Sequence, residues 1–438
     1  MKLFQQMLVA GASLSLLAPI AAQANDINLD EMNNYSRSNT SQPRLDSKTF
    51  INEVSEELAT LKGRVDGLEA QQNNLEAGAF SETTTLSGKA VFVVGAIDHP
   101  EKDSAANDDI SNESLQAQYQ YTMDLNTSFT GDDNLYVRLR TGNGDDGKNP
   151  FGITTYGTYL VSNSDKYSDG LNVDKIWYTF PVGERNTVWV GPKIENYYMH
   201  ATTPSIYKAV TKQFVLGGNG AAYGASTKTG AGWAFKADNG FAISSNVVTN
   251  GSSTGGILTD DSVTSWANQI GYTTDNYSAS LMVNLKYNGW EDSYYSTSTG
   301  HKRLNSSSVQ DANSTNYGLR GWWRPDDSGT ATPSISVGYD VSNIDGTGLT
   351  ANQDETTAWF VGLNWADIFQ ADDKIGLAFG QPQTREDETV DPFAWEAYYS
   401  FKVNDSVTVT PAIFGGSDRK GTANEDMTGA VLETTFKF

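Results

Sequence analysis

The stretch YSASLMVNLKY, residues 277–287, alternates apolar and polar side chains. Tyr277, Leu281 and Leu285 are among its odd-numbered apolar residues, whereas Ser278, Ser280, Asn284 and Lys286 lie between them. The stretch QAQYQYTMDL, residues 116–125, alternates in the same way. One apolar and one polar face over about ten residues is what a strand between lipid and a wet lumen needs. The pattern therefore predicts membrane-spanning β-strands.

Short turns rich in Asp, Asn and Gly separate these strands in pairs, and such sequences favour hairpins. They lie at residues 131–134, 183–186, 238–240, 274–276, 325–329, 371–374 and 404–406. Longer polar connections alternate with them at about 98–114, 144–171, 194–229, 250–262, 288–314, 343–355, 382–391 and 416–428. With a first strand at 83–96 and a last at 429–438, the strands number about sixteen. We therefore expect an all-β transmembrane barrel of about 16 antiparallel strands over residues 80–438, with short periplasmic turns, long outer loops and a water-filled lumen.

Composition agrees with this class. The chain has 438 residues, 38% of them hydrophobic, and a formal net charge of −23. Beyond the first two dozen residues, no run approaches the roughly 18 apolar residues of a spanning helix. Because the chain has no cysteine, it can form no disulfide, thiolate zinc site or thiol nucleophile. The acidic balance argues against a nucleic-acid partner, since such binding rests on basic surface.

The first 24 residues read as a secretory signal peptide. Lys2 supplies the positive charge, residues 7–22 form the apolar stretch, and Ala22-Gln23-Ala24 matches a cleavage site. Residues 25–47 are polar and are expected to be a disordered linker. The protein is therefore expected in the outer membrane of a Gram-negative type of bacterium.

A helical coiled coil is expected at residues 48–78, in the periplasm. Apolar residues recur at alternating spacings of three and four, which is a heptad seam. The charged pairs Glu57 with Lys62 and Arg64 with Glu69 favour parallel self-association, with a homotrimer preferred; an amphipathic helix lying on a domain is the alternative. The seam residues are Ile51, Val54, Leu58, Leu61, Val65, Leu68 and Leu75.

Three stretches carry a resemblance to a known family. They are ELATLKGRVDGLEA at residues 57–70, FSETTTLSG at 80–88 and WYTFPVGER at 177–185. In these stretches and in the order of its segments, the chain resembles the cyanobacterial iron-uptake porins, relatives of the carbohydrate-porin fold. Many members carry an S-layer-homology domain before the coiled coil, but residues 25–47 are too short for one. Contact with the cell wall is therefore in doubt.

The resemblance implies that the third long connection, about 194–229, folds inward and narrows the channel. Residues 204–214 could form a short helix there, and residues 196–237 contain no acidic residue. Strand phase places further basic side chains toward the lumen, against fewer acids (Asp124, Asp340, Glu396 and Glu433). A charged ring in a narrow passage sets ionic preference. The expected pore-lining residues are Arg138, Arg140, Lys175, Lys193, Lys208, Lys212, Lys228, Lys286 and Arg320.

Several functions remain open at this point. The basic residues favour small anions, beneath an outer vestibule rich in acids, but pairing with unseen acids would leave a weakly selective pore. The resemblance points instead to iron, and His99, His200 and His301 all lie in outer loops. Inward Trp177, Trp189 and Trp322 leave room for a sugar channel, and a structural envelope anchor with a plugged lumen is a further alternative. No metal site, cofactor or enzyme motif emerges, since there is no His-Glu-x-x-His and no Gly-x-Ser-x-Gly elbow between a strand and a helix.

The C-terminal strand ends on alternating aromatics, Phe436 and Phe438. Such an ending resembles the signal that the barrel-assembly machinery reads. The expected partners are thus other copies of the chain, outer-membrane lipid and that machinery.

Overall fold

A computed structural model describes residue 62 and residues 83–99, 113–144, 150–152, 160–163, 169–251, 256–288, 310–326, 332–347, 354–418 and 423–438. The chain divides into two compact units, residues 1–82 and 83–438. The expected signal peptide, linker and coiled coil, with its seam from Ile51 to Leu75, lie outside the described residues.

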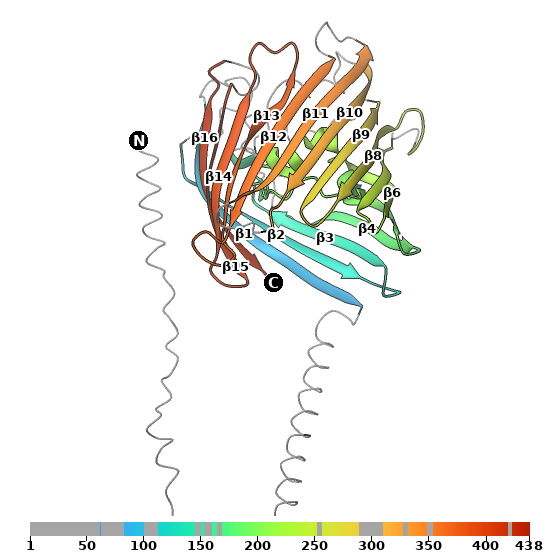
Figure 1. The fold of residues 1–438 in the computed structure, drawn as a ribbon, viewed down its shortest axis with the longest axis horizontal. Helices are drawn as coiled ribbons and strands as arrows, with labels where there is room; N and C mark the ends of the chain where they lie inside the picture. The colour runs from blue at the N-terminus through green and yellow to red at the C-terminus, as the bar shows by residue number, and fades with distance from the viewer. Residues whose placement is uncertain are drawn as a thin grey trace, which may run out of the picture. The chain divides into compact units, whose positions relative to one another are not determined.

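The second unit is a closed antiparallel barrel of sixteen strands (Figure 1), as the alternation predicts. The strands run in sequence order around the barrel, and β1 pairs with β16 to close it. They are β1 (Thr84–Asp98), β2 (Gln116–Thr127), β3 (Asn134–Gly142), β4 (Asn172–Val182), β5 (Asn186–Glu195), β6 (Thr227–Lys236), β7 (Phe241–Asn250), β8 (Val263–Thr273), β9 (Tyr277–Tyr287), β10 (Gln310–Trp323), β11 (Ser334–Thr347), β12 (Glu355–Ala366), β13 (Lys374–Arg385), β14 (Phe393–Lys402), β15 (Val407–Ser417) and β16 (Met427–Lys437).

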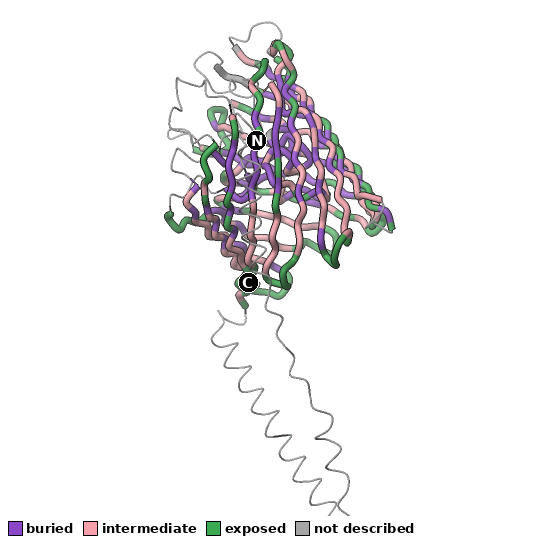
Figure 2. Tube along the Cα trace, turned by 90° about the vertical axis from the view of Figure 1, so that its left-hand side faces the viewer, coloured by how far each residue is buried: buried purple, intermediate pink, exposed green. Residues whose placement is uncertain are grey.

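The two faces of the strands differ as lipid and lumen require. In β9, Leu281 is 39% exposed whereas its neighbour Met282 is fully buried, and in β1 Phe92 is 51% exposed beside buried Val93. Buried and open positions alternate along most strands (Figure 2). The exposed apolar side chains face outward, which is the surface that a barrel presents to lipid.

Each expected short turn joins two of the strands. Two of these turns share a mechanism: Asp133 accepts hydrogen bonds from the backbone N–H groups of Phe129 and Thr130, and Asp373 accepts them from the turn before β13. A hydroxyl of the following hairpin completes each cap, Tyr178 at 2.6 Å and Tyr399 at 2.9 Å. The Tyr178 hydrogen bond is the main reason that the pKa of Asp133 lies well below its ordinary range.

Closure of the barrel extends to the last residue. The N–H of Gly88 donates to the carbonyl of Phe438 at 2.9 Å, and the N–H of Phe438 donates back at 3.2 Å. The Phe438 ring stacks on Tyr121, with ring centroids 5.7 Å apart, and Phe436 packs on Phe92 at 5.2 Å. The two terminal aromatics therefore join the last strand to the first two strands.

The few helical segments lie in the long connections. They are η3 (Pro150–Gly152), η4 (Asn196–Met199), η5 (Lys212–Gly217) and α4 (Gly220–Tyr223). The last three belong to the connection between β5 and β6, residues 196–226, which we call the third connection. No helical segment in the described part of the chain has the length and apolar character that crossing a membrane requires.

Candidate functional site in the barrel lumen

The third connection is fixed to the inner wall by a buried carboxyl group on β14. Glu396 is fully buried and accepts four hydrogen bonds from the connection. They come from the Tyr207 hydroxyl at 2.9 Å, the Val210 N–H at 2.9 Å, and the N–H and hydroxyl of Thr211 at 2.8 and 2.6 Å. A buried carboxylate requires such donors, because burial without them is costly. Glu396 therefore positions residues 207–211 beside the wall.

A second attachment uses an ion pair on β10 and β11. Arg320 and Asp340 lie 2.9 Å apart, and both side chains are only 1% exposed. The guanidinium also donates to the carbonyl oxygens of Leu216 at 2.7 Å and Asn219 at 3.3 Å, and its carbon lies 5.0 Å from the centre of the Tyr223 ring. Arg320 thus links the wall to the end of the third connection instead of projecting into open lumen.

Polar side chains of the wall hold the beginning of the connection. Ser244 accepts a hydrogen bond from the Ala201 N–H at 3.1 Å, and Gln269 accepts one from the Thr202 N–H at 2.9 Å. His200 is buried beneath them, with its Nε2 atom 2.9 Å from the Tyr223 carbonyl. Burial lowers the pKa of His200 to about 4, against a weaker opposing effect of that hydrogen bond.

Glycines of the wall leave room for the connection. A Cβ atom added at Gly338 on β11 would lie 1.8 Å from the carbonyl oxygen of Gly217, and one at Gly362 would lie 2.7 Å from the Tyr207 ring. Gly217 itself has φ +72°, which side chains disfavour. Close approach of the connection to the wall therefore requires glycine on both sides.

The second connection, residues 143–171, also contacts the third in its described parts. The Val161 N–H donates to the Val210 carbonyl at 2.9 Å, and Leu160 forms a β-bridge with Thr211. Ser162 donates to Glu433 of β16. Leu160 is completely buried, in a cluster with Phe214 and residues of the wall. Two connections thus pack together against one side of the barrel interior, which the sequence did not indicate.

Four of the expected pore-lining cations are paired with carboxylates. Arg138 lies 2.7 Å from Asp124, and Arg140 lies 3.7 Å from Asp174. Lys175 forms a buried ion pair with Glu195, and the fourth cation is Arg320. Asp174 and Glu195 are inward acids that the strand phase did not reveal, because irregular pairing beside Lys175 and before Glu195 breaks the alternation.

One expected lumen residue is placed on the other face. Lys193 lies opposite Ile176 and donates to the Val173 carbonyl at 2.8 Å, on the outer side of β4. The irregularity between Gly191 and Ile194 shifts the alternation of β5, so the expectation of an inward Lys193 is wrong. Lys228 is exposed near the start of β6.

The remaining three expected cations are separate from one another. Lys286 is buried at the end of β9, opposite Ser265 and Ser314. Lys212 is half-buried at the start of η5, and Lys208 is exposed in the third connection. The short helix expected over residues 204–214 is not found. Residues 204–211 are irregular, with bends and no helical turn, and their backbone bonds Glu396 and the second connection. Helical turns begin only at Lys212.

Sequence reasoning also missed three lumen lysines, Lys89, Lys374 and Lys437. Lys89 shares a face of β1 with buried Val91 and Val93, and Lys437 is its direct partner on β16. Because Phe92 and Val94 face outward, the alternation along β1 could have identified Lys89 as a residue that faces the lumen.

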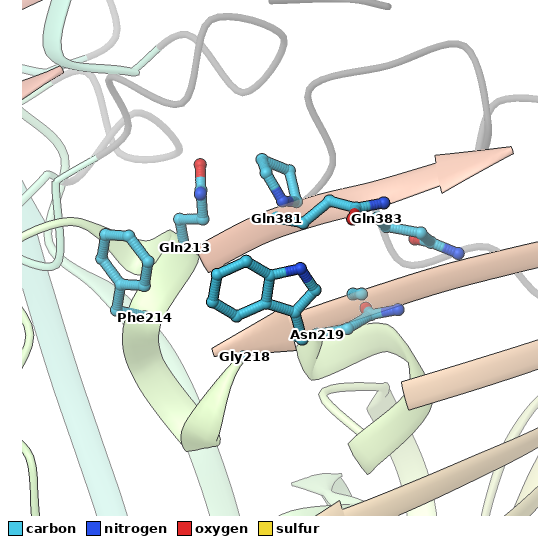
Figure 3. A pocket seen from close by; sticks show the side chains of 9 residues that line it. Gln213, Phe214, Gly218, Asn219, Gln381 and Gln383 are labelled. Carbon is cyan, nitrogen blue, oxygen red and sulfur yellow. The ribbon is translucent and has the colours of Figure 1, made fainter. Parts of the chain in front are cut away.

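A small cleft lies between the third connection and β13 (Figure 3). Gln213, Asn219, Gln381 and Gln383 supply amide groups, and Phe214 is among the side chains that complete the lining.

The inward tryptophans pack against other side chains and backbone, so they do not form an open stacked path for a sugar. Trp177 packs between Tyr136 and Tyr198, at centroid distances of 4.2 and 4.8 Å; Trp322 donates to the Thr203 carbonyl at 3.2 Å; Trp189 packs against buried clusters. Among the described residues, no group of His, Asp and Glu side chains is arranged to hold a metal ion.

Two cyanobacterial proteins are among the relatives of this chain by sequence. An uncharacterized protein of Nostoc sp. is 29% identical over 432 residues, covering 88% of this chain and 71% of that protein. An uncharacterized protein of Synechocystis sp. is 28% identical over 148 residues, covering 33% and 25%.

Solved structures share the fold at low sequence identity. Pseudomonas putida OprB at high pH superposes with a TM-score of 0.56 at 9% identity, covering 81% of this chain and 94% of that one. The anion-selective porin from Comamonas acidovorans gives 0.51 at 10% identity, covering 81% and 99%. The family model for "Carbohydrate-selective porin, OprB family" matches residues 46–438. This chain therefore belongs to the OprB family of carbohydrate-selective porins, outer-membrane channels rather than enzymes.

Proposed function

We propose that the protein is a passive porin for small hydrophilic solutes and inorganic ions, narrowed by its third connection. The observation that carries the proposal is the attachment of this connection to the inner wall at Glu396 and at Arg320 with Asp340. A connection held by buried polar groups keeps one position, so it would set a constant pore width.

Uptake into liposomes tests this function. Liposomes containing the full-length protein are mixed with neutral solutes of increasing size, and swelling is followed by light scattering. We expect rapid uptake of small solutes and a sharp size limit, which Gly338→Ala shifts upward because it displaces the third connection. Folded protein that admits no solute would instead support the envelope-anchor alternative.

A carbohydrate-selective channel is the second candidate, favoured by the cleft in Figure 3. Amide groups at Gln381 and Gln383 suit sugar hydroxyls. Glucose should then reduce the ionic current of the wild-type channel, and Gln381→Ala should relieve this block. Glucose without effect on the wild-type current would eliminate the candidate.

Export, self-association and orientation in the membrane complete the proposed function. We infer export by the signal at residues 1–24, a flexible linker at 25–47, and a periplasmic coiled coil at 48–78 that associates barrels as a homotrimer. The short turns would face the periplasm, and Phe436 and Phe438 would serve the barrel-assembly machinery. Relatives from Nostoc and Synechocystis support a cyanobacterial source. Iron as a transported ion rests on the sequence resemblance alone.

A further inference from the structure

Four lysines from separate parts of the fold lie toward the short-turn end of the lumen. Lys374 begins β13, Lys437 ends β16, and Lys89 lies directly across from Lys437 on β1. Lys208 comes from the third connection, and its pKa is lowered, first by the charge of Lys374, then by burial and by the charge of Lys437. We call these four residues the lysine cluster.

All four side chains share the inner face. On β1, Phe92 and Val94 face outward, so Lys89, an odd number of residues away, faces inward. On β13, Lys374 is on the same face as buried Gly376 and Ala378. Lys437 is four residues beyond Glu433, which contacts Ser162 of the second connection inside the barrel. The four ammonium groups therefore belong to one side of the lumen, next to the attached connections.

The cluster differs from the neighbouring arginines of the lumen because none of its charges forms an ion pair in the described part of the chain. Lys89, Lys208, Lys374 and Lys437 form no ion pair within the described residues, unlike Arg138 and Arg140 nearby. The acids acting on Lys89 are Asp124 and Glu433. Neither forms an ion pair with Lys89: Asp124 is bonded by Arg138 and Tyr136, and Glu433 by Ser162. Asp372 likewise acts on Lys374 while it is bonded by Lys402.

Like charges directly opposite each other on paired strands are destabilising. The repulsion within the Lys89–Lys437 pair, together with Lys208 and Lys374, is thus offset only by acids outside ion-pair distance, and a bound anion would offset it directly. Attraction grows with the anion's charge, and a tetrahedral oxyanion can accept hydrogen bonds from several ammonium groups at once. A divalent oxyanion suits this arrangement better than chloride does.

We propose that the lysine cluster binds a tetrahedral divalent oxyanion, phosphate or sulfate, on its way through the barrel. As a transport step this rests on the proposed porin function, whereas binding itself does not. Two independent measurements follow from that separation.

The first measurement is block of the potassium chloride current in planar bilayers by inorganic phosphate and, separately, by sulfate. The second is equilibrium dialysis of each radiolabelled anion with the detergent-solubilised full-length protein. Lys208→Gln and Lys437→Gln should each raise both the blocking and the dissociation constant about threefold to fivefold. The control Lys236→Gln removes one charge at the same end, on β6, five strands from β1, and should change neither constant.

The outcomes separate the two proposals. Conductance with neither block nor binding would overturn the anion site and leave the porin function standing. Binding that the cluster variants weaken, without any conductance, would support the site and overturn the porin function. Equal weakening by Lys236→Gln would reduce the effect to net charge and overturn the site. Circular dichroism of each variant confirms that the barrel is folded, and a response to only one anion assigns the site to it.

Discussion

Replacement of Glu396 by glutamine tests how the third connection is held. The Oε1 atom accepts from the Tyr207 hydroxyl and the Val210 N–H, and the Oε2 atom accepts from both donors of Thr211. An amide keeps one oxygen, so in either orientation the N–H of Val210 or of Thr211 loses its acceptor, while the hydroxyl beside it can turn to accept from the new NH2 group. The remaining hydrogen bonds lose their charged acceptor. At about 1.5–3 kcal/mol for each bond to a charged acceptor, docking of the connection weakens by about 3 kcal/mol or more. Local opening should then become on the order of 100-fold more frequent.

Hydrogen exchange read by mass spectrometry measures that opening at the bonded amides themselves. We expect the peptide that contains Val210 and Thr211 to exchange on the order of 100-fold faster in Glu396→Gln than in the wild type. The strand amides of β14 should be unchanged. Glu386→Gln, an exposed carboxylate between β13 and β14, is the matched control. Unchanged protection at Val210 and Thr211 would refute the reasoning, because Glu396 would then not hold the connection.

Three further predictions concern the same connection. Gly338→Ala places a methyl group 1.8 Å from the Gly217 carbonyl, so it should displace the connection and increase single-channel conductance; conductance equal to the wild type would count against the docked position. Arg320→Met leaves Asp340 buried without its cation and should cost about 3–5 kcal/mol in denaturant unfolding, whereas Arg320→Met with Asp340→Leu should recover much of this; an unchanged single variant would contradict the ion pair's role. Burial lowers the pKa of His200 from the ordinary 6.5 to about 4, so the unfolded chain binds the extra proton first: stability is complete above pH 6.5 and falls by about 3 kcal/mol as the pH approaches 4. His200→Gln should remove that part of the pH dependence, and an NMR titration of the His200 ring near 6.5 would disprove the burial effect.

Much of the barrel could be predicted from local sequence. Alternation of the kind seen in residues 277–287 specifies both faces of a strand, and Asp-rich turns specify its ends, because the turn aspartates bind their own backbone. These signals extend over only about ten residues, so they survive without knowledge of the rest of the fold.

The interior could be predicted only in part. Arg138 and Arg140 are inward as strand phase requires, but the irregular pairing near Lys175 and Gly191 moved Lys193 outward and brought Asp174 and Glu195 inward. A single irregular position reverses every later side chain, and nothing in the local pattern announces it.

The loop attachments were beyond local reasoning for a different reason. Thr211 and Glu396 are 185 residues apart, and Leu216 and Arg320 are 104 apart. A carboxylate on the polar face of a strand has the same sequence pattern whether it faces water or binds a connection. Only the closed barrel, with glycines such as Gly338 on its inner face, brings these groups together.

The buried polar groups also explain why a wide barrel can contain ordered connections. Asp340 and Glu396 are costly to bury alone, yet each is bonded to the third connection or to Arg320. If the third connection left the wall, buried polar groups on both sides would lose their hydrogen-bond partners. The docked position of the connection is therefore favoured over others. Under the proposed function, docking of residues 196–226 therefore sets the pore width.

Single-channel recording of the purified full-length protein in planar bilayers tests the central claim most directly. We expect stable open steps for the wild type, with larger and noisier steps for Glu396→Ala, in which all four hydrogen bonds from Tyr207, Val210 and Thr211 are lost. Correctly folded protein that conducts no ions, or a Glu396→Ala variant with steps identical to those of the wild type, would contradict a porin narrowed by its third connection.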